Sequence, residues 1–295
     1  MSTEDVSPRY LDLDLWPPTE QVAALYEDQL AAVAALGPAL VAIAAVVDPA
    51  ATRLRRGGRL VYVGAGSSAR IAVQDGAELL PTFNWPSAQI AFVIAGGEAA
   101  LLRAIENAED SGEQGRERID ELEIGPNDVV LGLAASGATP FTLAAVKAAR
   151  ARGALTIGIA NNAATPLLDI CDHPVLIETG EEAIAGSTRL KAGTAQKIAL
   201  NLISTAIMVR LGRVYRGMMV DMRPTNEKLR QRAAHMVMTI AGCAPAIAAN
   251  ALALAKDDIK VAALIAHGLT LEAASRLVAR HGGNLRAAMA ELKAG

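Results

Sequence analysis

Apolar residues along the chain follow two patterns that alternate with one another. Short and nearly continuous apolar runs, rich in Val, Ile and Leu, are typical of strands buried on both faces. These runs are residues 59–63, 90–94, 128–133, 155–159 and 174–177. The segments that follow them show helical spacing, and they are residues 69–79, 98–122, 139–152, 165–170 and 191–211. The alternation predicts a doubly wound α/β fold, in which helices flank both faces of a parallel sheet.

The two ends of the chain lack this alternation. Residues 1–19 are irregular and end in Trp16-Pro17-Pro18, whereas residues 20–54 have helical spacing with a break at Gly37-Pro38. After Thr225 the strands stop, and residues 231–295 predict four or five short amphipathic helices. We therefore expect an N-terminal helical arm over 1–54, a sheet domain over 55–230 and a small all-helical domain over 231–295.

The composition and charge of the chain limit the kinds of partner that it is expected to bind. A net charge of −3 provides no basic field for nucleic acid or an anionic membrane. The most apolar stretches are interrupted by charges or glycines, and the acidic N-terminus does not resemble a signal peptide, so no membrane span is expected. Cys171 and Cys243 lack the spacing of a disulfide framework or a zinc site. The sequence predicts a cytoplasmic protein with small-molecule or protein partners.

The first candidate site follows the first predicted strand, in Gly64-Ala65-Gly66-Ser67-Ser68-Ala69-Arg70. A turn from strand to helix presents free backbone N–H groups and the positive end of the helix dipole to an anion. Read as Gly-x-Gly-x-x-Ala, the turn also matches the dinucleotide fingerprint, but no acidic residue ends the second predicted strand. The hydroxyls of Ser67 and Ser68 favour a terminal phosphate instead, with a dinucleotide or a plain packing turn as alternatives.

A second loop of the same kind follows the third predicted strand, in Ala134-Ala135-Ser136-Gly137-Ala138-Thr139-Pro140. Pro140 suits the first turn of a helix and Thr139 its N-cap. Because the carboxyl ends of parallel strands meet at one edge of a sheet, the two loops should form one crevice. The sequence thus predicts a phosphorylated small molecule held by the following residues: Gly66, Ser67, Ser68, Ser136, Gly137 and Thr139.

Both loops resemble those of SIS (sugar isomerase) domains, and a longer run is more specific. The run Ala185-Gly-Ser187-Thr-Arg-Leu-Lys191-Ala-Gly-Thr-Ala-Gln-Lys197 resembles the signature of N-acetylmuramic acid 6-phosphate etherases and the related glucokinase regulatory proteins. Met219-Val-Asp221, Thr225–Leu229 and the helical tail extend the resemblance over roughly residues 55–295. It implies an SIS-type fold, a sugar-phosphate substrate, no metal or organic cofactor, and substrate contacts from Glu182, Ser187 and Lys191.

Two glutamates carry the chemistry that the resemblance implies. Family enzymes cleave the lactyl ether of N-acetylmuramic acid 6-phosphate, and the matching stretches place the catalytic glutamates at Glu78 and Glu109. In the ring-opened sugar the carbon-2 proton lies beside an aldehyde, so a carboxylate can remove it while an acid protonates the departing lactate oxygen. We expect Glu109 to be the base and Glu78 the acid, with water adding to the double bond afterwards.

The residues alone give these glutamates different settings. Glu78, between Ala77 and Leu79, has apolar neighbours that would raise the pKa of its carboxyl, whereas Glu109 sits in an acidic stretch typical of a solvated helix face. Three departures from the family are visible: residues 2–20 replace its usual opening, Ala138 stands where many members carry Arg, and Ala77 where Ser is frequent. The departures bear on substrate contacts and leave both glutamates in place.

Two other functions fit the SIS fold. An aldose–ketose isomerase would need a single base, so the two matched glutamates favour the etherase. A non-catalytic regulatory protein that senses sugar phosphates would be expected to contain two SIS domains rather than one.

The Ala-rich helices of 20–54 and 191–211 are too apolar for solvent on all sides, which predicts a homodimer with the pocket completed across its interface. The expected role is recycling of cell-wall amino sugars.

Overall fold

A five-stranded parallel sheet forms the centre of the fold in the computed structural model, which describes residues 2–103 and 105–294. The strand order is β2-β1-β3-β4-β5, and every neighbouring pair is parallel. The strands are β1 (Leu60–Gly64), β2 (Ile90–Ile94), β3 (Val129–Leu133), β4 (Leu155–Ala160) and β5 (His173–Leu176). The predicted parallel α/β sheet is confirmed, with strand bounds that differ by one residue at most from the predicted runs.

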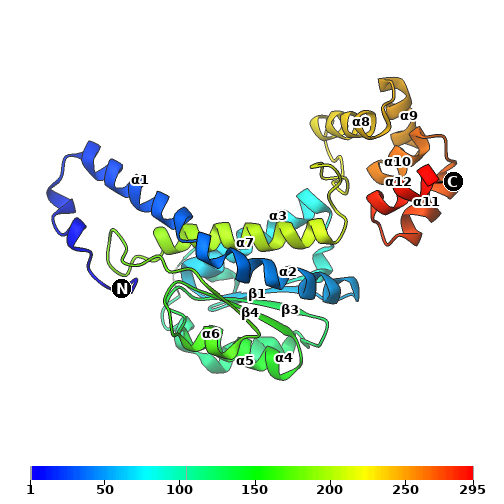
Figure 1. Ribbon diagram of the computed structural model, residues 1–295. Coiled ribbons are helices and arrows are strands. Elements are labelled where there is room, and N and C mark those ends of the chain that lie inside the picture. Colours follow the sequence, from blue (N-terminus) through cyan, green and yellow to red (C-terminus); the bar gives the residue numbers. More distant parts are fainter. Residues whose placement is uncertain (1, 104, 295) are drawn as a thin grey trace. The chain divides into compact units, whose positions relative to one another are not determined.

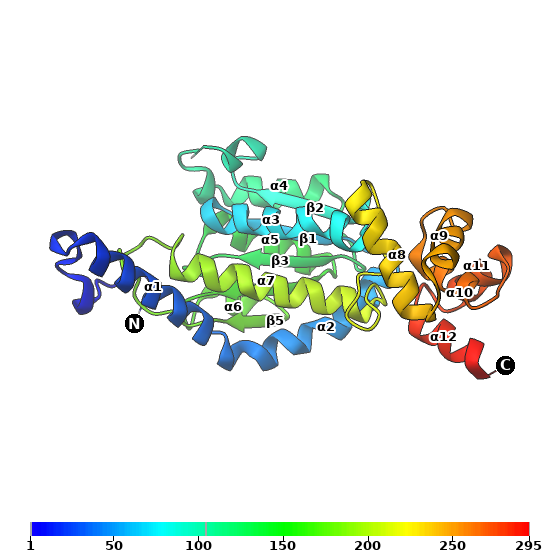
Figure 2. The same cartoon turned by 90° about the horizontal axis from the view of Figure 1, so that it is seen from above.

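Helices cover both faces of this sheet (Figure 1). One face carries α4 (Gly112–Glu121), α5 (Pro140–Ala151) and α6 (Pro166–Ile170). The opposite face carries α2 (Leu40–Arg55), α3 (Gly66–Phe83) and α7 (Lys191–Arg210), and Figure 2 shows α3 and α7 lying along the strands. Phe141 and Ile119 pack on Val61, Val63 and Val130 of the central strands. Burial on both faces explains why these strands read as continuous apolar runs.

The predicted helix over 98–122 is wrong in its first half. The structure has two short 3-10 turns, η5 (Glu98–Leu101) and η6 (Ala108–Asp110), before α4 begins. Gly97, with a φ of 68°, precedes η5, and Asn107, with a φ of 57°, interrupts the predicted helix before η6. Ser111 then caps α4 by accepting the Gln114 N–H. Among the described residues of this segment, 98–103 and 105–111, the backbone forms turns and loop rather than a continuous helix.

The N-terminal arm is helical, with the predicted break at Gly37-Pro38. After the turns η1 (Pro8–Tyr10) and η2 (Leu13–Leu15), α1 (Pro18–Ala34) continues through the turn η3 (Gly37–Ala39) into α2. Taken together, Pro18–Arg55 has 38 residues and is apolar enough to cross a membrane by length and composition, contrary to the expectation that charges and glycines interrupt every such stretch. Only 28% of its most apolar window is buried within the chain. A helix that packs on a protein partner is likewise long, apolar and little buried within its own chain.

The chain divides into two compact units. The first comprises Met1–Ala77 with Ser87–Thr205 and contains the sheet, whereas the second comprises Glu78–Pro86 with Ala206–Gly295. The helices of the tail are α8 (Glu227–Ala241), α9 (Pro245–Leu254), α10 (Ile259–Ala266), α11 (Leu271–Arg280) and α12 (Leu285–Ala294). Asn226, Asp258 and Thr270 cap α8, α10 and α11 with their side chains. Caps and apolar faces together make this tail helical, as predicted.

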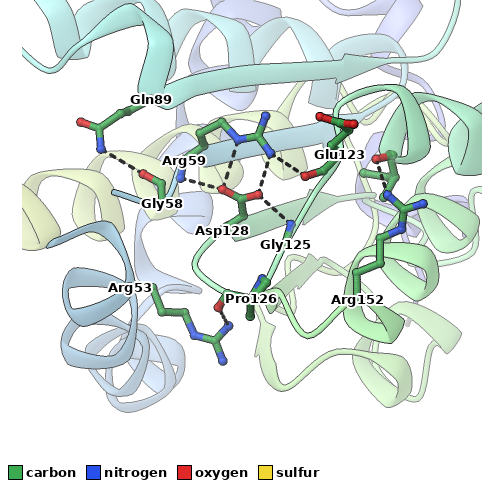
Figure 3. A network of polar contacts seen from close by, with 10 residues as sticks. Arg53, Gly58, Arg59, Gln89, Glu123, Gly125, Pro126, Asp128 and Arg152 are labelled. Carbon is green, nitrogen blue, oxygen red and sulfur yellow. Dashed lines mark hydrogen bonds and ion pairs between the residues drawn. The ribbon is translucent and has the colours of Figure 1, made fainter. Parts of the chain in front are cut away.

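A polar network joins the loops at the amino ends of the strands (Figure 3). The Asp128 carboxylate accepts hydrogen bonds from the Arg59 backbone N–H at 2.8 Å, from Arg59 Nε at 3.1 Å and Nη2 at 2.7 Å, and from the Gly125 N–H at 2.9 Å. Burial by itself raises the pKa of Asp128, but these hydrogen bonds outweigh it and hold the pKa below its ordinary value. The network fixes the start of β3 beside that of β1.

Candidate active site

The strand order predicts where this fold binds ligands. In an open parallel sheet the crevice lies where the order reverses, which in the order 2-1-3-4-5 is between β1 and β3, at their carboxyl ends. The loop after β1 enters α3 at Gly66, whose φ is 53°, and the loop after β3 enters α5 at Pro140. Both predicted phosphate loops therefore end at this crevice, each against the N-terminus of a long helix.

Local geometry determines the shape of the loop after β3. Gly137 has φ of 65°, and a Cβ there would lie 2.2 Å from Thr165 Oγ1, so only glycine fits the turn after Ser136. Thr139 occupies the N-cap of α5, but its side chain makes no capping hydrogen bond. The hydroxyl of Thr139 is thus available to a ligand, unlike that of an ordinary N-cap threonine.

A cavity of about 400 Å³, which we call the loop cavity, lies between the two loops. Five hydroxyl residues line it: Ser67, Ser68, Ser136, Thr139 and Thr188. Three carboxyl residues also line it, namely Glu4, Glu109 and Asp110, whereas no lysine or arginine is among its described lining residues. The structure brings together the predicted Gly66, Ser67, Ser68, Ser136 and Thr139, with Gly137 in the same turn. An anion here would be held by hydroxyls and backbone N–H groups.

The two predicted catalytic glutamates occupy different places. Glu109 lies in η6, is exposed and lines the loop cavity, so it belongs to a loop rather than to the solvated helix face suggested by its sequence. Glu78 lies in α3, eleven residues beyond Ser67, which corresponds to about 16 Å of helix. Its side chain is exposed, so the expected apolar setting is wrong for the single chain, and it does not line the loop cavity.

The sequence assigned substrate contacts to Glu182 and Lys191, but the structure gives both an internal role. Glu182 is fully buried, and its carboxylate accepts the N–H groups of Lys191 at 2.8 Å and Ala192 at 2.9 Å, which caps α7. Burial raises the pKa of Glu182, and the two hydrogen bonds partly counteract it. Lys191 Nζ pairs with Asp28 at 2.7 Å and donates to the Glu181 carbonyl at 2.5 Å. These residues bind α7 to α1.

Ser187, the third residue assigned from this run, lies in the loop before α7. Its neighbours Gly186 and Thr188 line the loop cavity, whereas Ser187 itself does not. Thr188 is therefore the hydroxyl of this run that faces the cavity. Polar residues at a helix start serve either as caps or as ligand contacts, and sequence alone does not distinguish the two uses.

Thr3 and Glu4 are site residues that the sequence analysis missed. Thr3 is completely buried: its N–H donates to Asn162 Oδ1 at 3.0 Å, its hydroxyl accepts from Asn162 Nδ2 at 3.0 Å, and its carbonyl accepts the Gly186 N–H at 3.0 Å. Asn162 Nδ2 also donates to the carbonyl of Ala135 beside Ser136. The anchored segment brings Glu4 to the loop cavity. The sequence carries little signal for this role, because Thr3 lies in an irregular opening and its partner Asn162 is 159 positions away.

A second cavity of about 340 Å³ adjoins the first, and we call it the arginine cavity. It shares Gly66, Ser67 and Glu109 with the loop cavity and is also lined by Arg70, Arg103 and Glu106. The helical unit has a separate cavity of about 560 Å³ beside Asp221 and Lys256, which contains none of the predicted site residues. Across residues 2–103 and 105–294, no group of three or more His, Cys, Asp or Glu side chains is arranged to hold a metal.

Two family descriptions match the chain. Residues 42–150 match the glucokinase regulatory protein N-terminal SIS domain, and residues 99–206 match the SIS domain. Among solved structures, a phosphoheptose isomerase from Francisella tularensis has a TM-score of 0.51 at 18% identity, covering 66% of this chain and 100% of that one. A phosphosugar isomerase involved in capsule formation from Bacteroides fragilis has a TM-score of 0.51 at 21% identity, covering 68% and 95%. The predicted SIS-type fold is confirmed.

Sequence relatives cover nearly the whole chain. The N-acetylmuramic acid 6-phosphate etherase of Deinococcus radiodurans is 48% identical over 98% of this chain and 95% of its own length. That of Rubrobacter xylanophilus is 46% identical over 98% and 96%, and that of Streptomyces coelicolor is 44% identical over 98% and 94%. The similarity therefore includes the N-terminal arm and the helical tail as well as the sheet.

Proposed function

Because this chain belongs to the family of N-acetylmuramic acid 6-phosphate etherases, we propose that it cleaves the D-lactyl ether of N-acetylmuramic acid 6-phosphate. The products are N-acetylglucosamine 6-phosphate and D-lactate. The protein is thus a carbon–oxygen lyase, and its elimination step is followed by the addition of water. One observation carries the assignment to this site: the hydroxyl-rich loops after β1 and β3 line the same cavity as Glu109. Phosphate recognition and a carboxylate base are thus adjacent.

The loop cavity fits the phosphate of this substrate. Ser67, Ser68, Ser136 and Thr139 supply hydroxyl donors, and the N-termini of α3 and α5 supply backbone N–H groups and positive dipole ends. Because the cavity lining includes Glu4 and Asp110, the phosphate is expected at the loops and away from these carboxylates. The carboxylates then face the sugar hydroxyls, which can donate hydrogen bonds to them.

The reaction requires a base and an acid at neighbouring carbons. Glu109 removes the carbon-2 proton of the open-chain aldehyde, and the electron pair forms the double bond between carbons 2 and 3. The bond from carbon 3 to the lactate oxygen breaks, and that oxygen takes a proton from Glu78. Water adds to the double bond, its hydroxyl going to carbon 3 and a proton to carbon 2. Each proton transfer by a positioned carboxyl contributes about 10²–10⁴ in rate.

A second copy of the chain supplies the acid in this proposal. Two groups that act on adjacent carbons must both lie within hydrogen-bond reach of the substrate, yet Glu78 is about 16 Å along α3 from Ser67. Exposed Val22, Tyr26, Leu30 and Val33 form an apolar face on α1 that a homodimer would cover. Each site would then combine Glu109 of one copy with Glu78 of the other.

Mixing inactive variants tests this arrangement. Glu78→Gln and Glu109→Gln chains, unfolded and refolded together, would form heterodimers in which one of two sites has both glutamates. Lactate release should return to about a quarter of the parent rate for random pairing. Recovery near zero, with heterodimers verified by mass spectrometry, would show that each site uses both glutamates of one chain.

The direct test of the activity is incubation of pure protein with N-acetylmuramic acid 6-phosphate and an assay for D-lactate. Release of stoichiometric lactate supports the etherase, whereas tight binding of sugar phosphate without turnover would favour a sensor.

We further propose a cytoplasmic location and a role in recycling cell-wall amino sugars, since charged phosphate esters do not cross a bilayer unaided. Recovery of the native protein in the membrane fraction after high-salt washing would contradict this location and point to Pro18–Arg55 as an anchor.

A further inference from the structure

The arginine cavity contains the cationic side chains that the loop cavity lacks. Arg70 and Arg103 line it, together with Glu106, and it meets the loop cavity at Ser67 and Glu109. The proposed base therefore lies between a cavity suited to phosphate and one that carries guanidinium groups. Such a separation matches a substrate with two anionic groups on opposite sides of the reacting carbons.

Arg70 is held in place with part of its donor set unused. Its Nε donates to the Leu101 carbonyl at 3.1 Å and its Nη2 to the Ala100 carbonyl at 3.0 Å. These bonds use two of the five N–H donors of a guanidinium and leave three for a ligand. Fixing the side chain in advance also lowers the entropy lost when an anion binds. Arg103 is exposed and has no ion-pair partner among the described residues.

Resting on the proposed function, we propose that the arginine cavity binds the lactyl carboxylate, with Arg70 as the main contact and Arg103 as a second one. A guanidinium presents a planar fork of N–H groups that matches a carboxylate bidentately. Glu106 also lines this cavity and offsets part of the attraction, so the hydrogen-bond geometry at Arg70 carries the recognition. Binding there would hold carbon 2 beside Glu109 and would distinguish substrate from product, which lacks the lactyl group.

The loss of one guanidinium should affect only ligands with the lactyl carboxylate. In Arg70→Met, kcat/KM for N-acetylmuramic acid 6-phosphate should fall about tenfold to a hundredfold. The inhibition constant of N-acetylglucosamine 6-phosphate should stay within about twofold, since that sugar has no carboxylate. Arg70→Lys should give a kcat/KM between those of the parent enzyme and Arg70→Met, because lysine keeps the charge and loses the fork of N–H groups. Arg116→Met, which removes an exposed arginine of α4 outside both cavities, is the matched control.

A neutral substrate analogue gives the second readout. With the lactyl carboxylate replaced by a carboxamide, the parent enzyme should lose about tenfold or more in kcat/KM, and Arg70→Met should not discriminate between the two compounds. Retained discrimination, or equal weakening of N-acetylglucosamine 6-phosphate, would overturn the assignment and make Arg70 a support of the 100–101 backbone. If the parent protein releases no lactate, the proposed function fails, and calorimetric titration with the two sugars still tests Arg70. A parent that binds both equally would then overturn it.

Discussion

The two ends of the central sheet use polar side chains in opposite ways. At the amino ends, the Asp128 carboxylate accepts four hydrogen bonds from Arg59 and Gly125, and its pKa is lowered accordingly (Figure 3). At the carboxyl ends, the side chains of Ser67, Ser68 and Thr139 make no hydrogen bond to any described residue. Polar groups satisfied within the chain stabilise the fold, whereas groups left unsatisfied around a cavity are available to a ligand.

Removing the proposed base should have the largest effect on activity. Glu109→Gln should abolish lactate release and also exchange of the carbon-2 hydrogen with deuterated solvent. Glu78→Gln should slow lactate release by about 10²–10⁴ while some exchange persists, because the base remains. Lactate by enzymatic assay and exchange by NMR measure the two steps. The reverse pattern would exchange the roles of the two glutamates, and parent rates in both variants would remove them from the mechanism.

Removing the charge of Asp128, at the amino ends of the strands, should lower the stability of the fold and leave activity unchanged. Asp128→Asn should lower the free energy of unfolding by about 2–3 kcal/mol, since it weakens charge-assisted hydrogen bonds to a partly exposed arginine. Its kcat/KM at 25 °C should match the parent enzyme. Urea unfolding and the lactate assay on one preparation measure both quantities. A large loss of kcat/KM in a fully folded variant would contradict the separation of the two ends.

Features that depend on neighbouring residues are visible in the sequence, whereas those that depend on distant partners or on burial are not. The strands and the polar loops that follow them were predictable because they depend on local apolar runs and small polar turns. Glu109 lines the loop cavity even though the helix predicted around it is a loop. The role of Thr3 was hidden because Asn162, its partner, is 159 positions away. The internal partners of Glu182 and Lys191 were not predictable, because burial decides between capping and binding, and a single sequence does not show burial at a helix start.

Single hydroxyls at the carboxyl ends should contribute a smaller amount, visible in binding alone. Ser136→Ala should weaken sugar-phosphate binding about tenfold, because a hydrogen bond to a charged group contributes about 1.5–3 kcal/mol. Its stability should change by less than about 0.5 kcal/mol, since among the described residues the hydroxyl is bonded to the Ala138 N–H alone. Calorimetric titration with N-acetylglucosamine 6-phosphate measures the first effect. Unchanged binding in a Ser67→Ala/Ser136→Ala double variant would refute the phosphate site.

The smallest expected effect is the change in pH dependence of stability between the parent protein and Asp128→Asn. The pKa of Asp128 is lower in the folded chain than its ordinary value of 3.8, so protons bind more weakly to the folded state than to the unfolded one. The contribution of Asp128 is therefore fully present above about pH 4 to 5 and is lost as pH falls through the folded pKa. Asp128→Asn lacks it, so the stability difference from the parent should shrink as the pH of urea titrations decreases from 6 to about 3. Asp172, whose pKa is also lowered by hydrogen bonds from Thr156, remains in both proteins and accounts for a shared residual slope. Parallel curves over this range would show that Asp128 stabilises the strand ends through its shape and hydrogen bonds rather than through its charge.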